Sequence, residues 1–327
     1  MTALAPPPDL GESDTLSSTV GGVHGDRAFR AIAFAAGMLV LAILALIAYA
    51  TTSKAWPAFT HEGLRFVTSR NWNPNTDHFG ALEFIYGTML TSFIALVLAV
   101  PASLGIALFI TELAPKHWRS VVTYVVDLLA AIPSVVYGFW ALAVFTKPAG
   151  QFYANVARTL GRVPVFSSLF GGPASGASFM TAGVVLAVMI TPIITSLSRE
   201  ALSTVAQDDK NGALAMGATR WEMLRVAVFP RVRSGLIGAA MLGLGRAMGE
   251  TIAVALVLGS SARITSHLFR PGDSMASVIV HEFPEATGLH HAALIGLGVV
   301  LFAITIVVNM FARSVAGRTS RMLGTTR

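Results

Sequence analysis

Six stretches of this chain carry apolar residues almost without interruption, and each is long enough to cross a bilayer. A helix needs roughly 20 apolar residues to span the hydrocarbon core. Only 12% of the residues are charged, whereas soluble globular proteins carry about 25%. The sequence therefore predicts an all-α integral membrane protein with six transmembrane helices. The expected spans are 31–50, 84–111, 120–145, 179–198, 234–260 and 292–312.

Arginine and lysine predict the side of the membrane on which each loop lies, because cytoplasmic segments are enriched in them. With the N-terminus inside, the inner segments hold 14 such residues and the longer outer segments hold 8. Both termini are therefore expected in the cytoplasm, and the protein in the plasma (inner) membrane. The net charge of +6 follows this bias and does not indicate a nucleic-acid partner. The expected outer loops are 51–82, 146–178 and 261–290.

The domain organisation follows from these spans. Residues 1–30 are expected to form a disordered cytoplasmic tail, and residues 31–312 a transmembrane domain with a cytoplasmic loop at 199–233. Residues 313–327 form a basic cytoplasmic tail. A cleaved signal peptide is disfavoured, because the first apolar run exceeds the usual length of about 7–15 residues. The glycine- and serine-rich segment 167–178 is expected to be irregular.

Local rules predict the structure of loop 199–233. Residues 211–216 are compatible with a helix, and Gly217 fits the left-handed position that follows a helix end. Thr219 stands three residues before Glu222, which is the spacing of a capping box that starts a new helix. The loop is therefore expected to contain a helix, a glycine turn and a second, short helix.

The second short helix is expected to be amphipathic. Trp221, Leu224 and Val228 share one face at spacings of three and four residues, and Pro230 limits the continuation of the helix. Two interpretations stay open from the local pattern. The helix lies on lipid headgroups, or it fits a groove on a partner protein.

Three charged residues lie inside predicted spans. Arg246 and Glu250 stand four residues apart in the fifth span, and Asp127 lies in the third. A charge at bilayer depth costs about 2.5–3.5 kcal/mol, so such residues generally serve a substrate pathway. The arginine fork matches two oxygens of an oxyanion.

The alternative is structural. The four-residue spacing lets Arg246 and Glu250 meet on one helix face, so the pair can simply neutralise itself. As a pathway residue, Glu250 is expected to hold Arg246. Asp127 is expected to pair with Arg246 or another basic group, or to make a buried packing bond.

Enzymatic chemistry has no visible basis in the sequence. The chain lacks cysteine, none of its four lysines follows a glycine as in a P-loop, and no nucleophile motif is present. His281-Glu282 and His290-His291 lack a third ligand at a metal-binding spacing and are expected to be exposed loop residues. We expect a transport subunit with no catalytic residue, no metal site and no cofactor of its own.

The loop resembles the EAA loop of ABC-importer permeases. In that loop a Glu-Ala-Ala triplet, three further residues and a glycine precede a short helix that closes on Leu-Pro. Gly217 and Pro230 stand at the matching positions. The triplet is Asn211-Gly212-Ala213 here, and Phe229-Pro230 replaces Leu-Pro.

Further motifs resemble the PstC-type permease family of phosphate importers, over about residues 64–312. Asp127 stands where a glutamate is commoner in that family. The matching segments are Trp-Asn-Pro at 72–74, Phe-Gly-Ala-Leu at 79–82, Tyr-Gly-Thr at 86–88, the run 127–138 that contains Ala-Ile-Pro-Ser, and Arg-Ala-Met-Gly-Glu-Thr at 246–251.

The resemblance implies a type I ABC importer permease (MetI-like) fold and the import of inorganic phosphate. It implies a homologous PstA-like permease, two PstB-like ATPase subunits that use ATP and Mg, and an extracytoplasmic PstS-like binding protein as partners. The alternatives are an importer of sulfate or molybdate, an ATP-independent channel or secondary transporter, or a membrane enzyme. Arg246, Glu250 and Asp127 are the expected pathway residues. The expected coupling-loop residues are Gly217, Ala218, Thr219, Arg220, Trp221, Glu222 and Pro230.

Overall fold

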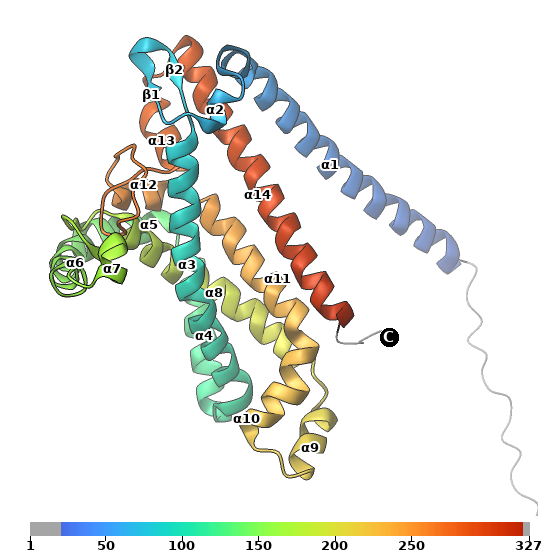
Figure 1. Ribbon diagram of the computed structural model, residues 1–327. Coiled ribbons are helices and arrows are strands. Elements are labelled where there is room, and N and C mark those ends of the chain that lie inside the picture. The colour runs from blue at the N-terminus through green and yellow to red at the C-terminus, as the bar shows by residue number, and fades with distance from the viewer. Residues whose placement is uncertain (1–20, 323–327) are drawn as a thin grey trace, which may run out of the picture. The chain divides into compact units, whose positions relative to one another are not determined.

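Long helices dominate the computed structural model, which describes residues 21–322 (Figure 1). Five of them are long and apolar enough to cross a membrane, and a bent pair makes a sixth when it is counted as one span. The predicted all-α membrane protein is therefore confirmed. The helices are α1 (Gly21–Glu62), α2 (Arg65–Thr68), α3 (Leu82–Leu108), α4 (Lys116–Ala131), α5 (Ser134–Trp140), α6 (Thr146–Leu160), α7 (Pro164–Phe170), α8 (Phe179–Ser203), α9 (Gln207–Ala215), α10 (Arg220–Met223), α11 (Phe229–Met248), α12 (Ile252–Leu258), α13 (Met275–Glu282) and α14 (Gly288–Met322).

Shorter elements connect these helices. Strands β1 (Trp72–Asn73) and β2 (His78–Phe79) pair antiparallel around a 3₁₀ turn. Three π-helical turns continue longer helices. They are Phe109–Leu113 after α3, Ala141–Phe145 between α5 and α6, and Leu224–Val228 between α10 and α11.

Two compact units divide the chain, Met1–Ala50 and Thr51–Arg327. In the first unit, α1 exposes apolar side chains along its length, such as Leu39 (62% exposed) and Leu46 (68%). This surface needs lipid or another protein, because water would not solvate it favourably. Residues 21–30 are helical, so the predicted tail is wrong there, and residues 1–20 lie outside the described part of the chain.

The second unit begins with the last turns of α1. Residues 51–62 were expected in a loop, but they stay helical. Ala55 and Ala58 are fully buried, and Ala58 belongs to a cluster with Phe66 and Phe84. Packing against this cluster gives the last turns of α1 a partner that the local sequence does not show.

An aromatic cluster joins the β1–β2 hairpin to α13 and α14. The indole Nε1 of Trp72 donates a hydrogen bond to Glu282 Oε2 at 2.9 Å, and His290 Nε2 lies 2.8 Å from the same oxygen. The His290 ring stacks on Phe79 with 5.6 Å between centroids. The prediction of exposed loop positions is therefore wrong for Glu282 and His290, because these residues lie at helix ends that the hairpin covers.

Helices α3 and α8 pack along most of their length and form the centre of the second unit with α11 (Figure 1). Their contact is built from small buried residues, including Ala95 and Ala99 of α3 and Ala182 of α8. Ser103 Oγ donates to the Thr191 carbonyl oxygen at 3.1 Å across the contact. Helices in lipid associate through such close packing and interhelical hydrogen bonds, because lipid provides no hydrophobic driving force between them.

Gly87 allows the loop before α13 to approach α3 closely. A Cβ atom at Gly87 would overlap the backbone oxygen of Asp273 and lie 3.3 Å from Phe179 Cε1. Burial raises the pKa of the Asp273 carboxyl above its ordinary value, which reflects how little water reaches this contact. The contact therefore leaves no room for a side chain.

We expect Gly87→Ala to lower the melting temperature of the detergent-solubilised protein. The backbone has to shift to admit the methyl group, at a cost of about 1–3 kcal/mol. Gly105→Ala in the same helix is the matched control, because a Cβ there meets nothing within 4 Å. Equal melting temperatures for the two variants would contradict the close approach.

The third predicted span is broken. Helix α4 and the segment Ser134–Leu160 meet at a bend of 89°, so a single continuous span over 120–145 is wrong. Pro133 explains the break, because proline lacks a backbone N–H and disfavours helical geometry in the preceding residue. Ile132 accordingly has an extended backbone, with ψ 127°. Pro101 and Pro192, in contrast, lie within α3 and α8.

The other predicted boundaries agree in part. The second predicted span lies within α3 and the π-helical turn that follows it, and α8 and α14 contain the fourth and sixth, so these three spans are confirmed. Segment 146–178 was expected as a loop but contains α6 and α7. The irregular stretch therefore begins only at Gly171, because Ser167–Phe170 belong to α7. The stacking of Tyr153 on Phe269, at 4.6 Å between centroids, holds α6 to the chain that precedes α13.

Candidate functional site

Segment 199–233 folds at the end of the second unit that lies opposite the β1–β2 hairpin (Figure 1). Gly217 has φ 88° and follows α9, as predicted. The predicted capping box is also present. Thr219 N donates to Glu222 Oε2 at 2.8 Å, and Glu222 N donates to Thr219 Oγ1 at 3.3 Å. The helix, turn and second helix expected from the sequence are thus confirmed.

The predicted apolar face of the second helix is only partly confirmed. Leu224 and Val228 are buried with Met223 in one cluster, but Trp221 is 62% exposed. Its ring makes an edge-on contact with Phe229, at 6.4 Å between centroids. The predicted apolar face placed Trp221 beside Leu224 in the buried cluster, but Met223 fills that position instead. The π-helical turn that begins at Leu224 also changes the helical period on which the predicted face was based.

Pro230 does not end the second helix as predicted. It lies in the first turn of α11, directly after the π-helical turn Leu224–Val228, so the helix continues through this position. The tip of the segment then presents exposed apolar side chains on both sides of the glycine turn. Met216 is 87% exposed and Trp221 is 62% exposed. Such an apolar tip is typical of a surface that another molecule covers.

Arg246 and Glu250 lie on either side of a helix break. Arg246 stands in the last turn of α11, which ends at Met248 and is followed by the cap residue Gly249, and Glu250 lies between α11 and α12. Glu250 Oε1 accepts a hydrogen bond from the Ala253 N–H at 3.3 Å. The prediction of one shared helix face is therefore wrong. Within residues 21–322 no ion pair joins the two side chains, because the glycine ends the helix and Glu250 turns to cap the next one.

Asp127 lies on an exposed face of α4, next to Val126, which is buried. No hydrogen bond or ion pair in the described part of the chain connects it to Arg246 or Glu250. The predicted packing bond is likewise not formed there. The Arg246 side chain is also exposed, and Glu250 is half-buried. Within this single chain, the side chains of Asp127 and Arg246 are therefore uncovered, and that of Glu250 is covered only in part.

The structure does bring together the helices that follow these charged motifs. Helix α5 begins after the Pro133 break and packs against α12, which begins after the Glu250 break. The contact is close, because a Cβ atom at Gly138 would lie 2.8 Å from Ala253 Cα. The two interrupted spans thus meet immediately beyond their breaks.

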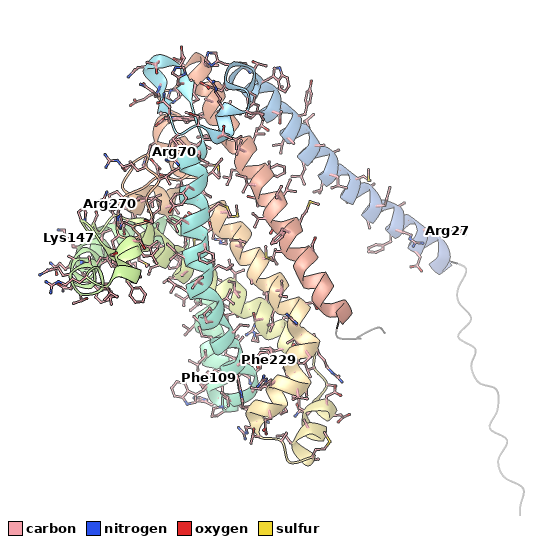
Figure 2. All side chains as sticks on the ribbon, in the orientation of Figure 1. Arg27, Arg70, Phe109, Lys147, Phe229 and Arg270 are labelled. Atoms are coloured by element: carbon pink, nitrogen blue, oxygen red, sulfur yellow. The ribbon has the colours of Figure 1, made fainter. Side chains whose placement is uncertain are left out.

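Two ion pairs that the sequence did not reveal hold α9 in place. Lys210 Nζ lies 2.6 Å from Glu112 Oε1 in the π-helical turn after α3, and Arg231 of α11 pairs with Asp209. In Figure 2, the label Phe109 marks the start of the π-helical turn that contains Glu112, and the label Phe229 marks the start of α11. Local patterns could not have found the first pair, because 98 residues separate its members.

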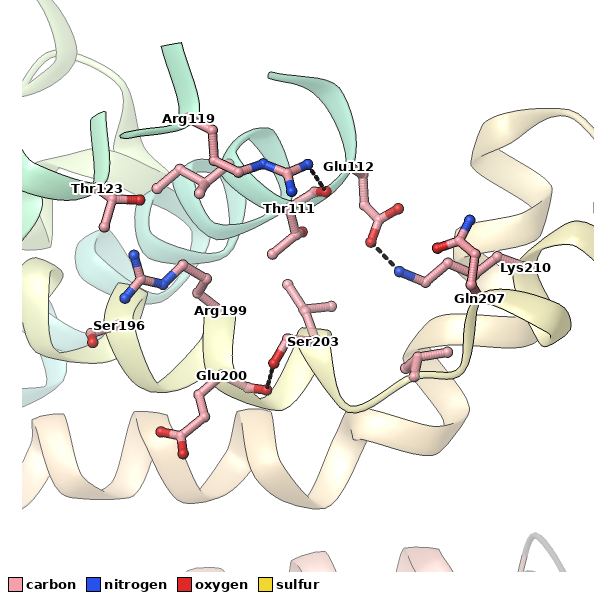
Figure 3. Close-up of a pocket in the computed structure, with 13 residues that line it drawn as sticks. Thr111, Glu112, Arg119, Thr123, Ser196, Arg199, Glu200, Ser203, Gln207 and Lys210 are labelled. Atoms are coloured by element: carbon pink, nitrogen blue, oxygen red, sulfur yellow. Dashed lines mark hydrogen bonds and ion pairs between the residues drawn. The ribbon is translucent and has the colours of Figure 1, made fainter. Parts of the chain in front are cut away.

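A polar cavity of about 950 Å³ lies beside the Lys210–Glu112 pair (Figure 3). Arg119, Arg199 and Lys210 line it together with Glu112 and Glu200. Arg119 Nη2 donates to the Thr111 carbonyl oxygen at 2.7 Å. The cavity separates α9 from α4, so little packing supports α9 on that side.

Known proteins identify the family. The model of the "Binding-protein-dependent transport system inner membrane component" family matches residues 99–321. The "Phosphate transport system permease protein PstC" of Mesorhizobium japonicum is 42% identical over 291 residues, which cover 88% of this chain and 89% of that protein. The chain belongs to this permease family. The PstC protein of Xylella fastidiosa (strain Temecula1) is 40% identical, with 94% and 97% covered, and PstC 2 of Mycobacterium tuberculosis is 40% identical, with 90% and 92% covered.

Solved structures give the same fold for this permease. A chain in the crystal structure of a bacterial ABC transporter involved in the import of the acidic polysaccharide alginate superposes with a TM-score of 0.60 at 15% identity, over 90% of this chain and 98% of that one. The predicted type I ABC importer permease fold and the resemblance to PstC-type permeases are confirmed. The chain is thus a multi-pass membrane component of an ABC transport system.

Proposed function

We propose that this chain is the permease subunit of an ATP-driven importer that carries inorganic phosphate across the plasma membrane. The observation that carries the proposal is the identity of about 40% to phosphate permease proteins PstC over nearly the whole of both chains. No observation on the molecule favours sulfate, molybdate or an ATP-independent mechanism.

The partners follow from the same relationship. A PstA-like permease would complete the membrane domain, and two PstB-like ATPase subunits would bind and hydrolyse ATP with Mg. The chain itself has no P-loop and needs no catalytic residue for this role. A PstS-like protein would deliver phosphate from outside. A solved alginate transporter in complex with its periplasmic protein offers a structural precedent for that arrangement.

The loop 199–233 would face the cytoplasm and dock into the ATPase subunits, with both chain termini on the same side. The residues proposed to make or shape that contact are Gly217, Ala218, Thr219, Arg220, Trp221, Glu222 and Pro230. Two features support docking over a helix lying on lipid. The capping box of Thr219 and Glu222 fixes the start of the second helix, and the exposed apolar side chains of Met216 and Trp221 project from the tip of the turn.

Arg246, Glu250 and Asp127 would serve the phosphate pathway. Their open placement suits a pathway between two permease subunits, since the second subunit would complete the lining. The guanidinium of Arg246 offers two parallel donors to phosphate oxygens. Glu250 would fix the start of α12, through the Ala253 contact, and so set the break beside Arg246. The role of Asp127 would be to meet a basic group of the second subunit.

Reconstitution tests the proposed function. The four kinds of subunit are assembled in proteoliposomes with ATP inside, and uptake of labelled phosphate is measured with the binding protein outside. We expect uptake that needs both ATP and the binding protein, and that excess sulfate or molybdate does not suppress. Uptake without ATP would indicate a channel or secondary transporter instead, and preferential sulfate uptake would identify another oxyanion as the substrate.

The proposed orientation is tested with single cysteines, because the natural chain has none. Thr76 and Ser203 are both exposed in the structure. We expect Thr76→Cys to react with a membrane-impermeant maleimide on intact spheroplasts, and Ser203→Cys to react only after the membrane is opened. Labelling of Ser203→Cys from outside would overturn the orientation.

A further inference from the structure

Helix α9 is fixed to the rest of the chain by two ion pairs that leave from neighbouring residues. Lys210 points to Glu112 and Asp209 pairs with Arg231 (Figure 3 shows the first). The two pairs differ in burial. The side chains of Lys210 and Glu112 are 10% and 13% exposed, whereas that of Arg231 is 54% exposed. Exposed ion pairs contribute little to stability. The half-exposed Arg231–Asp209 pair is therefore expected to hold α9 less firmly than the Lys210–Glu112 pair does.

The Lys210–Glu112 pair is the polar link between α9 and the end of α3. It is the only hydrogen bond or ion pair between α9 and residues 82–131 in the described part of the chain. The cavity of about 950 Å³ lies beside it, so packing does not join α9 to α4 there. On its other side, α9 packs against α10 and the π-helical turn before α11, where Ala213 joins the apolar cluster.

Glu112 lies in the π-helical turn that follows α3. The π-helical turn Phe109–Leu113 continues α3 without interruption, and α3 packs along α8 to the hairpin end of the unit. A displacement of α9 that is passed to Glu112 would therefore reach the central helices directly. The apolar cluster that Ala213 joins also contains Ala107 and Leu108 of α3, so the ion pair adds a directional polar link to a contact that apolar packing begins.

We propose that Lys210 and Glu112 are positioning residues for energy coupling. They join α9 to the end of α3, so that the two segments move as one body when the ATPase subunits move the loop. This role rests on the proposed docking of those subunits to loop 199–233. The pair touches neither phosphate nor nucleotide, and it acts by transmitting movement.

The first experiment measures phosphate uptake and ATP hydrolysis on the same proteoliposomes. Glu112→Gln and Lys210→Met are expected to lower the phosphate transported per ATP about tenfold, in line with the interaction energies of residues in contact. The ATPase subunits should still co-purify, since the docking surface is unchanged. The reversed pair, Glu112→Lys with Lys210→Glu, should recover most of the ratio. Glu200→Gln is the matched control, because it removes the same charge from an exposed side chain lining the same cavity.

A ratio that stays at the wild-type value in both single variants overturns the proposal. So does a reversed pair that assembles normally but couples no better than the single variants. If wild-type vesicles take up no phosphate, that result contradicts the proposed function and not the role of the Lys210–Glu112 pair. ATP hydrolysis stimulated by the binding protein then remains as the readout of coupling.

A second experiment replaces the ion pair with a covalent link. In the cysteine-free chain, Glu112→Cys and Lys210→Cys introduce the only two thiols, and a short bismaleimide bridges them in the assembled complex. We expect the bridged complex to transport phosphate, because segments that move together tolerate a fixed link. Loss of transport on bridging, with transport before it, would show that the segments separate during the cycle and would refute the proposal.

Discussion

Replacing Arg246 with glutamine is expected to reduce phosphate uptake at least about a hundredfold, because two charge-assisted hydrogen bonds to the passing anion are lost at about 1.5–3 kcal/mol each. Arg246→Lys keeps the charge but loses the planar fork, so its uptake should fall between those of the wild type and the glutamine variant. Uptake of labelled phosphate per assembled complex is the measurement. Binding of phosphate by the separate binding protein should stay unchanged.

Glu250 supplies the control for Arg246. Because the structure shows Glu250 capping α12 and not paired with Arg246, removing both charges should not restore transport. Glu250→Gln keeps an oxygen that can accept the Ala253 hydrogen bond, and we expect it to lower uptake less than Arg246→Gln does. If the double variant with both glutamines transports well, the two residues form a structural pair in the working complex. Arg246 then loses its assignment to the phosphate pathway.

Substituting Gly217 with valine is expected to separate ATP hydrolysis from transport. Gly217 has φ 88°, a conformation that costs a side-chain-bearing residue about 1–2 kcal/mol and costs a β-branched one more. The turn should therefore shift and move α10 relative to α9. We expect uptake to fall at least about tenfold at that cost, while the protein still inserts into the membrane.

Gly212→Val is the matched control for Gly217→Val. Gly212 lies in the same loop, within α9, and a Cβ atom there also meets nothing within 4 Å. The two substitutions thus add the same side chain to equally open surroundings and differ mainly in the backbone conformation that they demand. Coupled uptake at the wild-type rate in the Gly217 variant would reject the role of the turn in docking.

The sequence predicted this loop well because its structure depends on short-range chemistry. A glycine in the left-handed region and the reciprocal hydrogen bonds of Thr219 and Glu222 involve residues at most a few positions apart. The apolar spans were predictable for a similar reason, since their length must match the bilayer. The exposed position of Trp221 was not, because it depends on which neighbour fills the cluster around Leu224 and Val228.

Breaks in the membrane helices were harder to predict. Pro101, Pro133 and Pro192 all lie in predicted spans, yet only Pro133 lies at a break between helices. The tertiary surroundings of each proline decide that outcome, and the local sequence does not show them. Gly249 likewise gave no sign that it ends α11, so the inferred Arg246–Glu250 pair depended on a helix that does not continue. Contacts such as Lys210–Glu112, which join residues 98 positions apart, leave no local pattern.

The cavity beside α9 has a consequence for the solvent. Its volume of about 950 Å³ corresponds to about 30 water molecules at the volume that each occupies in the liquid. Its lining carries charged groups that can form hydrogen bonds with water. Any step of the cycle that narrows the space must return part of this water to bulk, and the reverse step must take it up again. The free energy of that step therefore includes a hydration contribution that varies with the osmotic pressure of the surrounding solution.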